Sequence, residues 1–392
     1  MKNTAKLLSL ALVLLMTVAC FAACSGDSKV NYAKNNTEYY IGASGPLTGG
    51  AAVYGIAVKN SAQMAVDEIN AKGGVNGVKL KFVMMDDAHK PENVSTNYTT
   101  MFEAGMQVSL GCVTSAPCLE FKTLSHNDNL FFLTPSASAD AVVEYDNAYQ
   151  MCFADANQGG EAARYVNANY AGQTIGMLYR SDDPYSTGIR EKFKATLDSS
   201  ITLVEASFSG ETVASFQSQI DTLKSCKFIF MPIYYTPAAQ FMDEAKNDVA
   251  PDAVYYGCDG LDGIDTSVAG FDITKIPQKV SYLSHFNSKA TDGAAAEYIK
   301  KYTEKFGSET LNQFGASAYD CVYAIYNAML MAGDKVSVTS SPSEICDVLR
   351  DIFNGGFTYT TPGVTGSSIK WESSGFVNKE ALVYVVKESD AK

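Results

Sequence analysis

Short apolar runs alternate with amphipathic stretches along most of this chain. A short apolar run bounded by turn residues predicts a buried strand, whereas apolar residues at helical spacing predict a helix. Strand–helix alternation of this kind is typical of a parallel sheet with helices on both of its faces. In the first part of the chain, the pattern predicts strands at 41–43, 80–85, 108–111 and 130–133, and helices at 56–69, 94–103 and 119–127.

The same alternation begins again near residue 159, so the chain carries two similar α/β units in series. In open parallel sheets, ligands bind beyond the carboxyl ends of the strands. Two such units therefore predict a cleft between them, which a hinge would allow to close. The second part is predicted to contain helices at 159–169, 186–199, 216–223, 238–247, 294–306 and 317–331, and strands at 175–179, 201–204, 228–231, 254–256, 369–371 and 382–386.

The N-terminal segment has a different pattern, in which two lysines precede an apolar run at 7–18 and small residues then lead to Cys24. These features predict a signal peptide over 1–23, and the run is too short to span a bilayer comfortably. A cysteine directly after small residues is typical of a bacterial lipobox, so we expect a lipid on Cys24. A lipid on the less favourable Cys20 and plain secretion are the alternatives.

Residues 24–37 are small and polar, which predicts a flexible tether between the lipid and the folded part of the chain. The protein is therefore expected to work outside the cytoplasm, anchored to the cell membrane.

Composition narrows the function further. Hydrophobic residues make up 46% of the chain, enough for sizeable cores, and the net charge is −13. Nucleic-acid binding needs clustered lysine and arginine, so this charge argues against it. The histidines, at 89, 126 and 285, are far apart and no CxxC spacing occurs, so we expect no metal site and no cofactor. Most of the cysteines beyond Cys24 are expected to be small buried hydrophobes.

Two loops after predicted strands carry serines that could bind an anion. Ser115 lies in the loop at 112–117 and Ser138 in the loop at 134–140, each before an expected helix. Helix N-termini carry unpaired N–H groups and partial positive charge, which attract carboxylate or phosphate. The alternative is that both serines are ordinary helix N-caps.

In the second unit, Asp259 follows a predicted strand and could face the cleft to neutralise a cation. It could instead be a turn residue, because Gly260 comes next. The spacing to Asp262 and Asp265 does not fit a calcium loop.

Tyrosines also gather at strand ends and could line a small-ligand pocket, although with 23 tyrosines in the chain any single one could simply be packing. These strand-end tyrosines are Tyr54, Tyr185, Tyr234 and Tyr235.

Several stretches resemble the leucine/isoleucine/valine-type periplasmic binding proteins, the extracytoplasmic receptors of branched-chain amino-acid ABC transporters. The resemblance extends from about residue 39 to residue 387, nearly all of the chain beyond the tether. The matching stretches are 41–49 with 53–55, 67–77, 85–88, 133–135 and 361–366. The first two of these are specific when taken together.

This resemblance implies two doubly wound parallel-sheet lobes joined by a three-crossover hinge. Lobe 1 would comprise 38–153 and 287–362, and lobe 2 would comprise 154–286 and 363–392. A disulfide that some relatives have would fall at His89 and Thr114 and is therefore absent here.

The resemblance also implies a set of ligand contacts. Ser115 and Ser138 would hold the α-carboxylate of an amino acid. The backbone carbonyl of Ser136 and the side chain of Asp259, where Glu is common in relatives, would hold its ammonium group. The residues that would line the pocket for the ligand's side chain are Tyr54, Tyr185, Tyr235 and Phe314.

We therefore expect a lipid-anchored, monomeric solute-binding receptor that captures an amino acid, branched-chain or otherwise apolar, and delivers it to ABC transporter permease subunits. Catalysis is not expected, since the chain has no GxSxG, phosphate-cradling GxxxxGK or metal-binding histidine cluster. The alternatives are a receptor for another small solute, such as an amide or aromatic acid, and a ligand-sensing module for a separate signalling partner.

Overall fold

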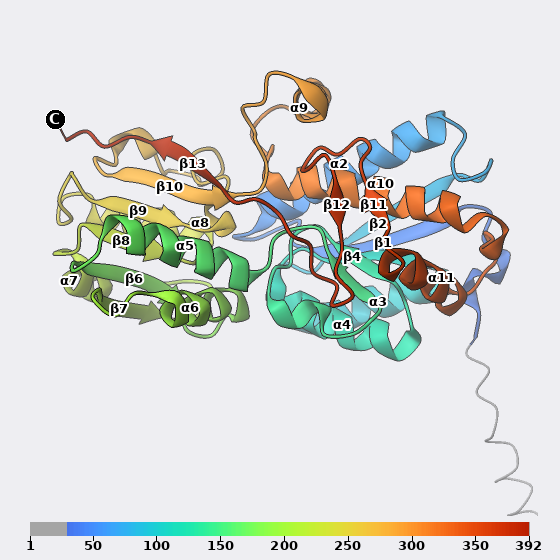
Figure 1. Cartoon of the computed structure of the whole chain (residues 1–392), viewed down its shortest axis with the longest axis horizontal. Coiled ribbons are helices and arrows are strands. Elements are labelled where there is room, and N and C mark those ends of the chain that lie inside the picture. Colours follow the sequence, from blue (N-terminus) through green and yellow to red (C-terminus); the bar gives the residue numbers. More distant parts are fainter. Residues whose placement is uncertain (1–29, 392) are drawn as a thin grey trace, which may run out of the picture.

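Two β-sheets form the centres of two lobes that lie end to end (Figure 1). The computed structural model describes residues 30–391. The predicted signal peptide and the lipidation site at Cys24 lie outside these residues and stay predictions. Part of the predicted tether is folded: Tyr32–Asn35 form a 3-10 helix, Ala33 is buried, and Asn36 Nδ2 donates to the Gly105 carbonyl at 2.9 Å.

The sheet of the first lobe has the order β2-β1-β3-β4-β5, with every pair of neighbours parallel. Alternate residues of β1 face opposite sides. Ile41 packs in the core with α2 and α10, and Tyr40 packs in the core with α3 and α4. The elements are β1 (Tyr39–Gly45), α2 (Ala52–Ala71), β2 (Leu80–Asp86), α3 (Pro91–Glu103), β3 (Val108–Cys112), α4 (Ser115–Asp128), β4 (Phe132–Thr134), β5 (Ala148–Gln150) and α10 (Gln313–Ala332).

The sheet of the second lobe has the order β13-β10-β9-β8-β6-β7. It is parallel except for its edge strand β13, which runs antiparallel to β10. Helices α5 and α6 cover one face, and α7 and α8 cover the other. The elements are α5 (Asp155–Asn169), β6 (Thr174–Arg180), α6 (Pro184–Thr196), β7 (Thr202–Phe208), α7 (Gln217–Leu223), β8 (Phe228–Met231), α8 (Tyr235–Ala245), β9 (Val254–Gly257), β10 (Lys279–Ser284) and β13 (Leu382–Lys387).

The chain crosses between the lobes after β5, after β10 and before β13, as expected for a three-crossover hinge. Helices α9 (Gly293–Phe306), α10 and α11 (Pro342–Asn354) lie on the side of the first lobe, with a small hairpin of β11 (Thr358–Tyr359) and β12 (Ile369–Lys370). Beyond β12, the Trp371 indole N–H donates to the Gln150 carbonyl at 2.6 Å, and the Gln150 N–H donates to the Gly375 carbonyl at 3.0 Å. We therefore place the last crossing after Gly375 and not at the predicted boundary after residue 362.

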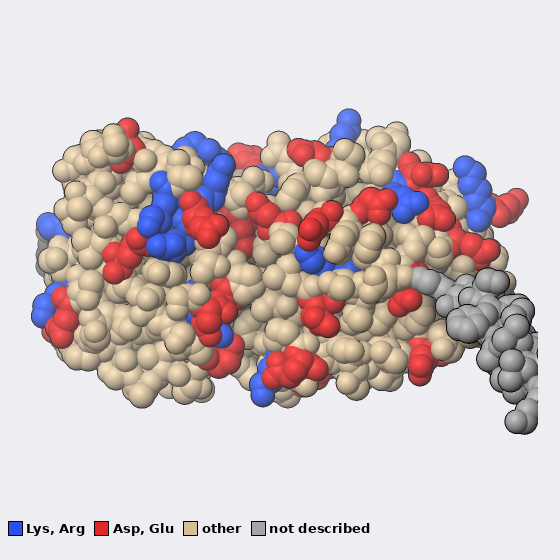
Figure 2. Space-filling model, turned by 90° about the horizontal axis from the view of Figure 1, so that it is seen from below, with Lys and Arg blue, Asp and Glu red and all other residues tan. Residues whose placement is uncertain are grey.

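The predicted class of two α/β lobes is confirmed, but, apart from the short 3-10 helices, four elements of the described residues are absent from the sequence-based prediction: β5, β10, α11 and β11. The predicted strands at 369–371 and 382–386 belong to different sheets. None of the helices in residues 30–391 combines the length and apolar character that a membrane crossing requires. On the face shown in Figure 2, acidic and basic side chains are interspersed, so this face carries no continuous basic stripe.

Candidate functional site

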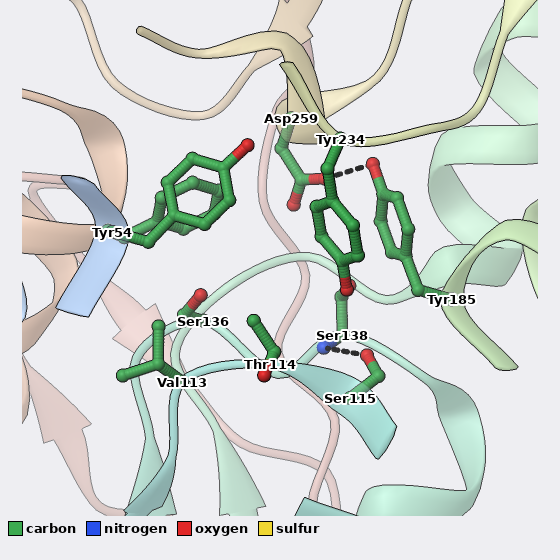
Figure 3. Close-up of a pocket in the computed structure, with 10 residues that line it drawn as sticks. Tyr54, Val113, Thr114, Ser115, Ser136, Ser138, Tyr185, Tyr234 and Asp259 are labelled. Carbon is green, nitrogen blue, oxygen red and sulfur yellow. Dashed lines mark hydrogen bonds between the residues drawn. The ribbon is translucent and has the colours of Figure 1, made fainter. Parts of the chain in front are cut away.

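A small cavity lies between the lobes, where loops from the carboxyl ends of both sheets meet (Figure 3). The cavity is nearly filled by its own side chains, with about 10 Å³ of space for the centre of a water molecule, roughly what one bound water needs. A larger solute would therefore enter only if the walls moved apart. The ten residues that line the cavity are Tyr54, Val113, Thr114, Ser115, Ser136, Ser138 and Phe314 from the first lobe, and Tyr185, Tyr234 and Asp259 from the second.

On the first lobe, two serine loops are bonded to each other. The Ser115 hydroxyl oxygen accepts hydrogen bonds from the backbone N–H groups of Ser138, at 3.3 Å, and Ala139, at 3.1 Å. A serine hydroxyl has two acceptor lone pairs and one O–H donor. Both acceptor positions of Ser115 are thus occupied, and only its O–H remains for a ligand. A group that can only donate favours a carboxylate or carbonyl oxygen as its partner.

The two serine loops lead into different structures. Helix α4 begins at Ser115 itself, and its N-cap Thr114 makes no side-chain capping bond. The alternative that Ser115 is an ordinary N-cap is therefore wrong. The loop of Ser138 leads only into a 3-10 helix, Asp140–Val143. The helix expected after Ser138 is thus only one short 3-10 turn, which sums few peptide dipoles.

Asp259 enters the cavity from the second lobe, directly after β9 (Figure 3). Its side chain is 1% exposed, and its Oδ1 accepts a hydrogen bond from the Tyr185 hydroxyl at 2.8 Å. Its Oδ2 is buried and has no hydrogen-bond partner among the described residues. Burial raises the pKa of Asp259 to about 7, although the Tyr185 hydrogen bond acts in the opposite direction. A buried, unpartnered carboxylate oxygen is costly, so a cationic ligand group would be stabilised beside it.

The turn that carries Asp259 requires the glycine that follows it. An ideal Cβ on Gly260 would lie 2.6 Å from the Tyr185 hydroxyl oxygen and 2.9 Å from the Ile233 carbonyl oxygen. The Gly260 N–H instead donates to the Tyr185 hydroxyl at 2.9 Å, and the Asp259 N–H donates to Gln158 Oε1 at 3.0 Å. The two interpretations of Asp259 are therefore compatible, because its backbone forms the turn while its side chain faces the cavity.

Aromatic rings form the other walls. Tyr54 packs edge-on against Phe314 with 4.7 Å between ring centroids. From the second lobe, Tyr185 and Tyr234 stack at 4.8 Å with their planes 14° apart. The Tyr54 hydroxyl donates to the Gly260 carbonyl at 2.5 Å, so the two lobes are joined directly beside the cavity. Such rings offer apolar area with polar tips, which suits a small amphipathic ligand.

Seven of the eight predicted ligand-contact residues line the cavity, and Tyr235 does not. Its ring packs behind the wall, against Tyr54, with 5.1 Å between centroids. The adjacent Tyr234, the extended N-cap of α8, faces the cavity instead. Val113 and Thr114 also line the cavity without having been predicted to do so, and their position beside Ser115 was the available signal.

Within residues 30–391, no group of three or more histidine, cysteine, aspartate or glutamate side chains is placed to hold a metal ion. The cysteines at 112, 118, 152, 226, 258, 321 and 346 are all buried with free thiols. They pack as small hydrophobic side chains, as expected.

Known proteins share this sequence pattern and fold. Residues 38–344 match the sequence profile of the family described as periplasmic binding protein. The Leu/Ile/Val-binding protein BraC3 of Rhizobium johnstonii is 29% identical over 304 residues, which are 70% of this chain and 81% of that protein.

Two solved structures show the likeness in fold. The leucine-binding protein LivK of Thermotoga maritima has a TM-score of 0.76 at 20% identity, covering 89% of this chain and 95% of that chain. A solute-binding protein of an ABC transporter from Rhodopseudomonas palustris BisB5, in complex with 3,4-dihydroxybenzoic acid, has a TM-score of 0.75 at 16% identity, covering 90% and 94%.

Proposed function

The chain belongs to the periplasmic binding protein family, and from this premise we propose that it is an extracytoplasmic receptor that captures an amino acid between its two lobes. Branched-chain or other apolar amino acids are the preferred class, because a relative is named for leucine, isoleucine and valine and because aromatic rings wall the cavity. The receptor would act by binding alone, without catalysis.

The proposal rests on one observation: a hydroxyl group that can only donate, on one lobe, and an unpartnered carboxylate oxygen, on the other lobe, face the same cavity. The first lobe presents the O–H of Ser115, whose acceptor positions are both occupied. The second lobe presents Asp259 Oδ2, which is buried and without a partner. An amino acid carries a carboxylate and an ammonium group, so it would satisfy both ends, with Ser138 and the Ser136 carbonyl as further contacts. A bound ion that leaves either end unpaired costs several kcal/mol.

The cellular role extends this proposal. A lipid on Cys24 would hold the receptor at the membrane, and permease subunits of an ABC transporter would receive the ligand from it. The N-terminal sequence supports the anchor, since small residues lead directly to Cys24. Sensing for a signalling partner would use the same site, and neighbouring permease and ATPase genes would favour transport.

A thermal-shift screen of the twenty amino acids and simple organic acids tests the proposal. A ligand at a hundredfold excess over its Kd adds about 2.7 kcal/mol to the free energy of unfolding, which raises the melting temperature measurably. We expect one or more apolar amino acids to give the largest shift, with calorimetry giving a micromolar or tighter Kd, about −8 kcal/mol. A screen in which no amino acid shifts the melting temperature would reject the proposed ligand class.

An aromatic carboxylic acid is the second candidate, because a structure of the same fold holds 3,4-dihydroxybenzoic acid. Such an acid has no ammonium group and would bring a second negative charge beside Asp259. Asp259→Asn would therefore leave aromatic-acid binding unchanged or tighter while weakening amino-acid binding, so this variant separates the two classes.

A further inference from the structure

His89 contacts both lobes at the rim of the cavity. It lies in the loop after β2, where its backbone adopts a positive φ of 63°, which is uncommon for a residue other than glycine. Its side chain is buried, and its Nδ1 lies 2.8 Å from the hydroxyl oxygen of Thr114, which lines the cavity on the same lobe. Its ring also packs edge-on against Tyr234, a cavity residue of the second lobe, with 5.2 Å between centroids.

The second lobe also supplies a charged partner for His89. Its Nε2 lies 3.4 Å from Glu211 Oε1, in the loop after β7. Glu211 is held there by Arg180, whose Nη1 donates to the same oxygen at 2.7 Å, and Arg180 Nε donates to Asp182 at 2.8 Å. A neutral imidazole with its proton on Nε2 can accept from Thr114 and donate toward Glu211 at the same time. One side chain thus joins a cavity wall of the first lobe to two groups of the second.

We propose that His89 is an interlobe latch, a positioning residue that holds Thr114 against Tyr234 and Glu211 and so stabilises the closed arrangement around the ligand. The latch rests on the proposed function, because it concerns closure around a bound solute. Tyr234, Glu211 and Arg180 would all move away from His89 when the lobes separate, since all three come from the second lobe. The Thr114 contact would persist, so the latch contributes to closure through the second-lobe contacts alone.

The latch has a defined pH dependence. Burial lowers the pKa of His89 in the closed arrangement, Glu211 raises it and Arg180 lowers it. The other titratable groups that face His89 are Asp87, which accepts from its backbone N–H at 2.9 Å, and Tyr234. The net effect lowers the pKa below its ordinary value of about 6.5, so an open form that exposes His89 to solvent would bind the proton more tightly than the closed form. The contribution to closure would then be present above a pH of about 6.5 and would be lost as pH falls below it.

The first test follows ligand release. The probe is the radiolabelled amino acid that gives the largest shift in the thermal screen, with L-leucine as the first choice. Glu211 is more than half exposed, so we expect Glu211→Gln to raise the dissociation rate about two- to fivefold. His89→Gln should raise it by at least this factor, because it also removes the ring packing on Tyr234, and the double variant should match His89→Gln alone. His126→Gln and Glu297→Gln, at exposed positions on α4 and α9, are the matched controls.

The second test needs no ligand. Spin labels on Thr96→Cys in α3 and Ser218→Cys in α7, both exposed, report the distance between the lobes. All measurements use an Asp259→Asn background, which removes the cost of burying an ionised, unpartnered carboxylate in the empty cavity and the pH effect of that group. The latch predicts longer distances in His89→Gln and Glu211→Gln than in the two control variants at pH 7.5. It also predicts a lengthening between pH 7.5 and 5.5 that His89→Gln reduces.

Distances and release rates equal to those of the controls would overturn the latch even if an amino acid binds. A screen without any bound amino acid would instead reject the proposed function, and the spin-label distances would still decide on the latch.

Discussion

Replacing Asp259 by Asn tests most directly whether the negative charge of this side chain binds a cationic group of the ligand. The change keeps the shape of the side chain and the oxygen that accepts from Tyr185, but removes the negative charge. A hydrogen bond to a charged group contributes about 1.5–3 kcal/mol, and breaking a buried ion pair costs about 3–5 kcal/mol. We therefore expect amino-acid affinity to fall at least tenfold, and by about a hundredfold if the ammonium group lies beside the side chain without intervening water.

The same variant should not destabilise the ligand-free protein. Burial raises the pKa of Asp259 from 3.8 to about 7, which corresponds to about 4 kcal/mol. A carboxyl group with a raised pKa adds stability below its unfolded pKa, and that stability is lost as pH rises toward 7. Asn carries no charge at any of these pH values. At neutral pH the free energy of unfolding should therefore stay the same or rise, by at most about 4 kcal/mol.

Asp262 provides a matched control three residues away. It is also buried, and its pKa is raised to about 6 mainly by burial. Both of its oxygens have partners, however: Oδ1 accepts from the Tyr282 hydroxyl at 2.9 Å, and Oδ2 accepts from the Gln313 N–H at 3.0 Å. Asp262→Asn should therefore lower the melting temperature, because the amide nitrogen replaces an acceptor, while ligand affinity changes little.

Calorimetry in two buffers gives the decisive measurement. In the closed, empty cavity about half of the Asp259 side chains are protonated near pH 7, and an ammonium ion requires the ionised form. Binding to protein that is already closed should therefore release about half a proton per ligand, so the enthalpy should differ between phosphate and Tris buffers. Binding to open protein, in which Asp259 is solvated, should release little. In either case, unchanged affinity in Asp259→Asn would refute the assignment of Asp259 to the ammonium group.

Three further variants test how the site and the first lobe are supported. Tyr185→Phe removes the hydroxyl that donates to Asp259, so the pKa of Asp259 should rise further. Calorimetry should show amino-acid binding weakened about fivefold. Gly55→Ala places a Cβ 1.9 Å from the carbonyl oxygen of Pro46, so urea unfolding should show a loss of several kcal/mol in the free energy of unfolding. Asp320→Ala leaves the four hydrogen bonds donated from 359–365 without their acceptor, and the same assay should show a loss of about 3 kcal/mol or more.

The alternating pattern predicts most of the fold because each buried strand and each amphipathic helix carries its own local signal. The resemblance to the periplasmic binding protein family is confirmed for the same reason, since it follows several stretches along the chain. Strand β5 has only three residues, too few to show a period. Helix α11 could have been predicted, because Ser341 and Glu344 form a capping box with Pro342 in the first turn.

The details of the site depend on tertiary contacts, which the local pattern does not contain. The occupied acceptor positions of Ser115 arise from a loop that follows the next strand. Tyr234 and Tyr235 are adjacent at the end of a strand, and only the extended conformation of the N-cap decides which ring faces the cavity. Residue type and position at the end of a strand were thus enough to identify the loops around the cavity. Which side chains line the cavity could be seen only in the packed structure.

The arrangement of charges also makes closure conditional on the ligand. An ionised Asp259 that is solvated when the lobes are apart would be buried without a partner for Oδ2 when they close empty. That step costs at most about 4 kcal/mol at neutral pH, close to a thousandfold in population. The ammonium group of an amino acid bound as we propose would remove the cost, while the carboxylate of the same molecule would engage the opposite lobe. Because neither lobe offers both contacts, a molecule that carries both charges would favour the closed form over the open one.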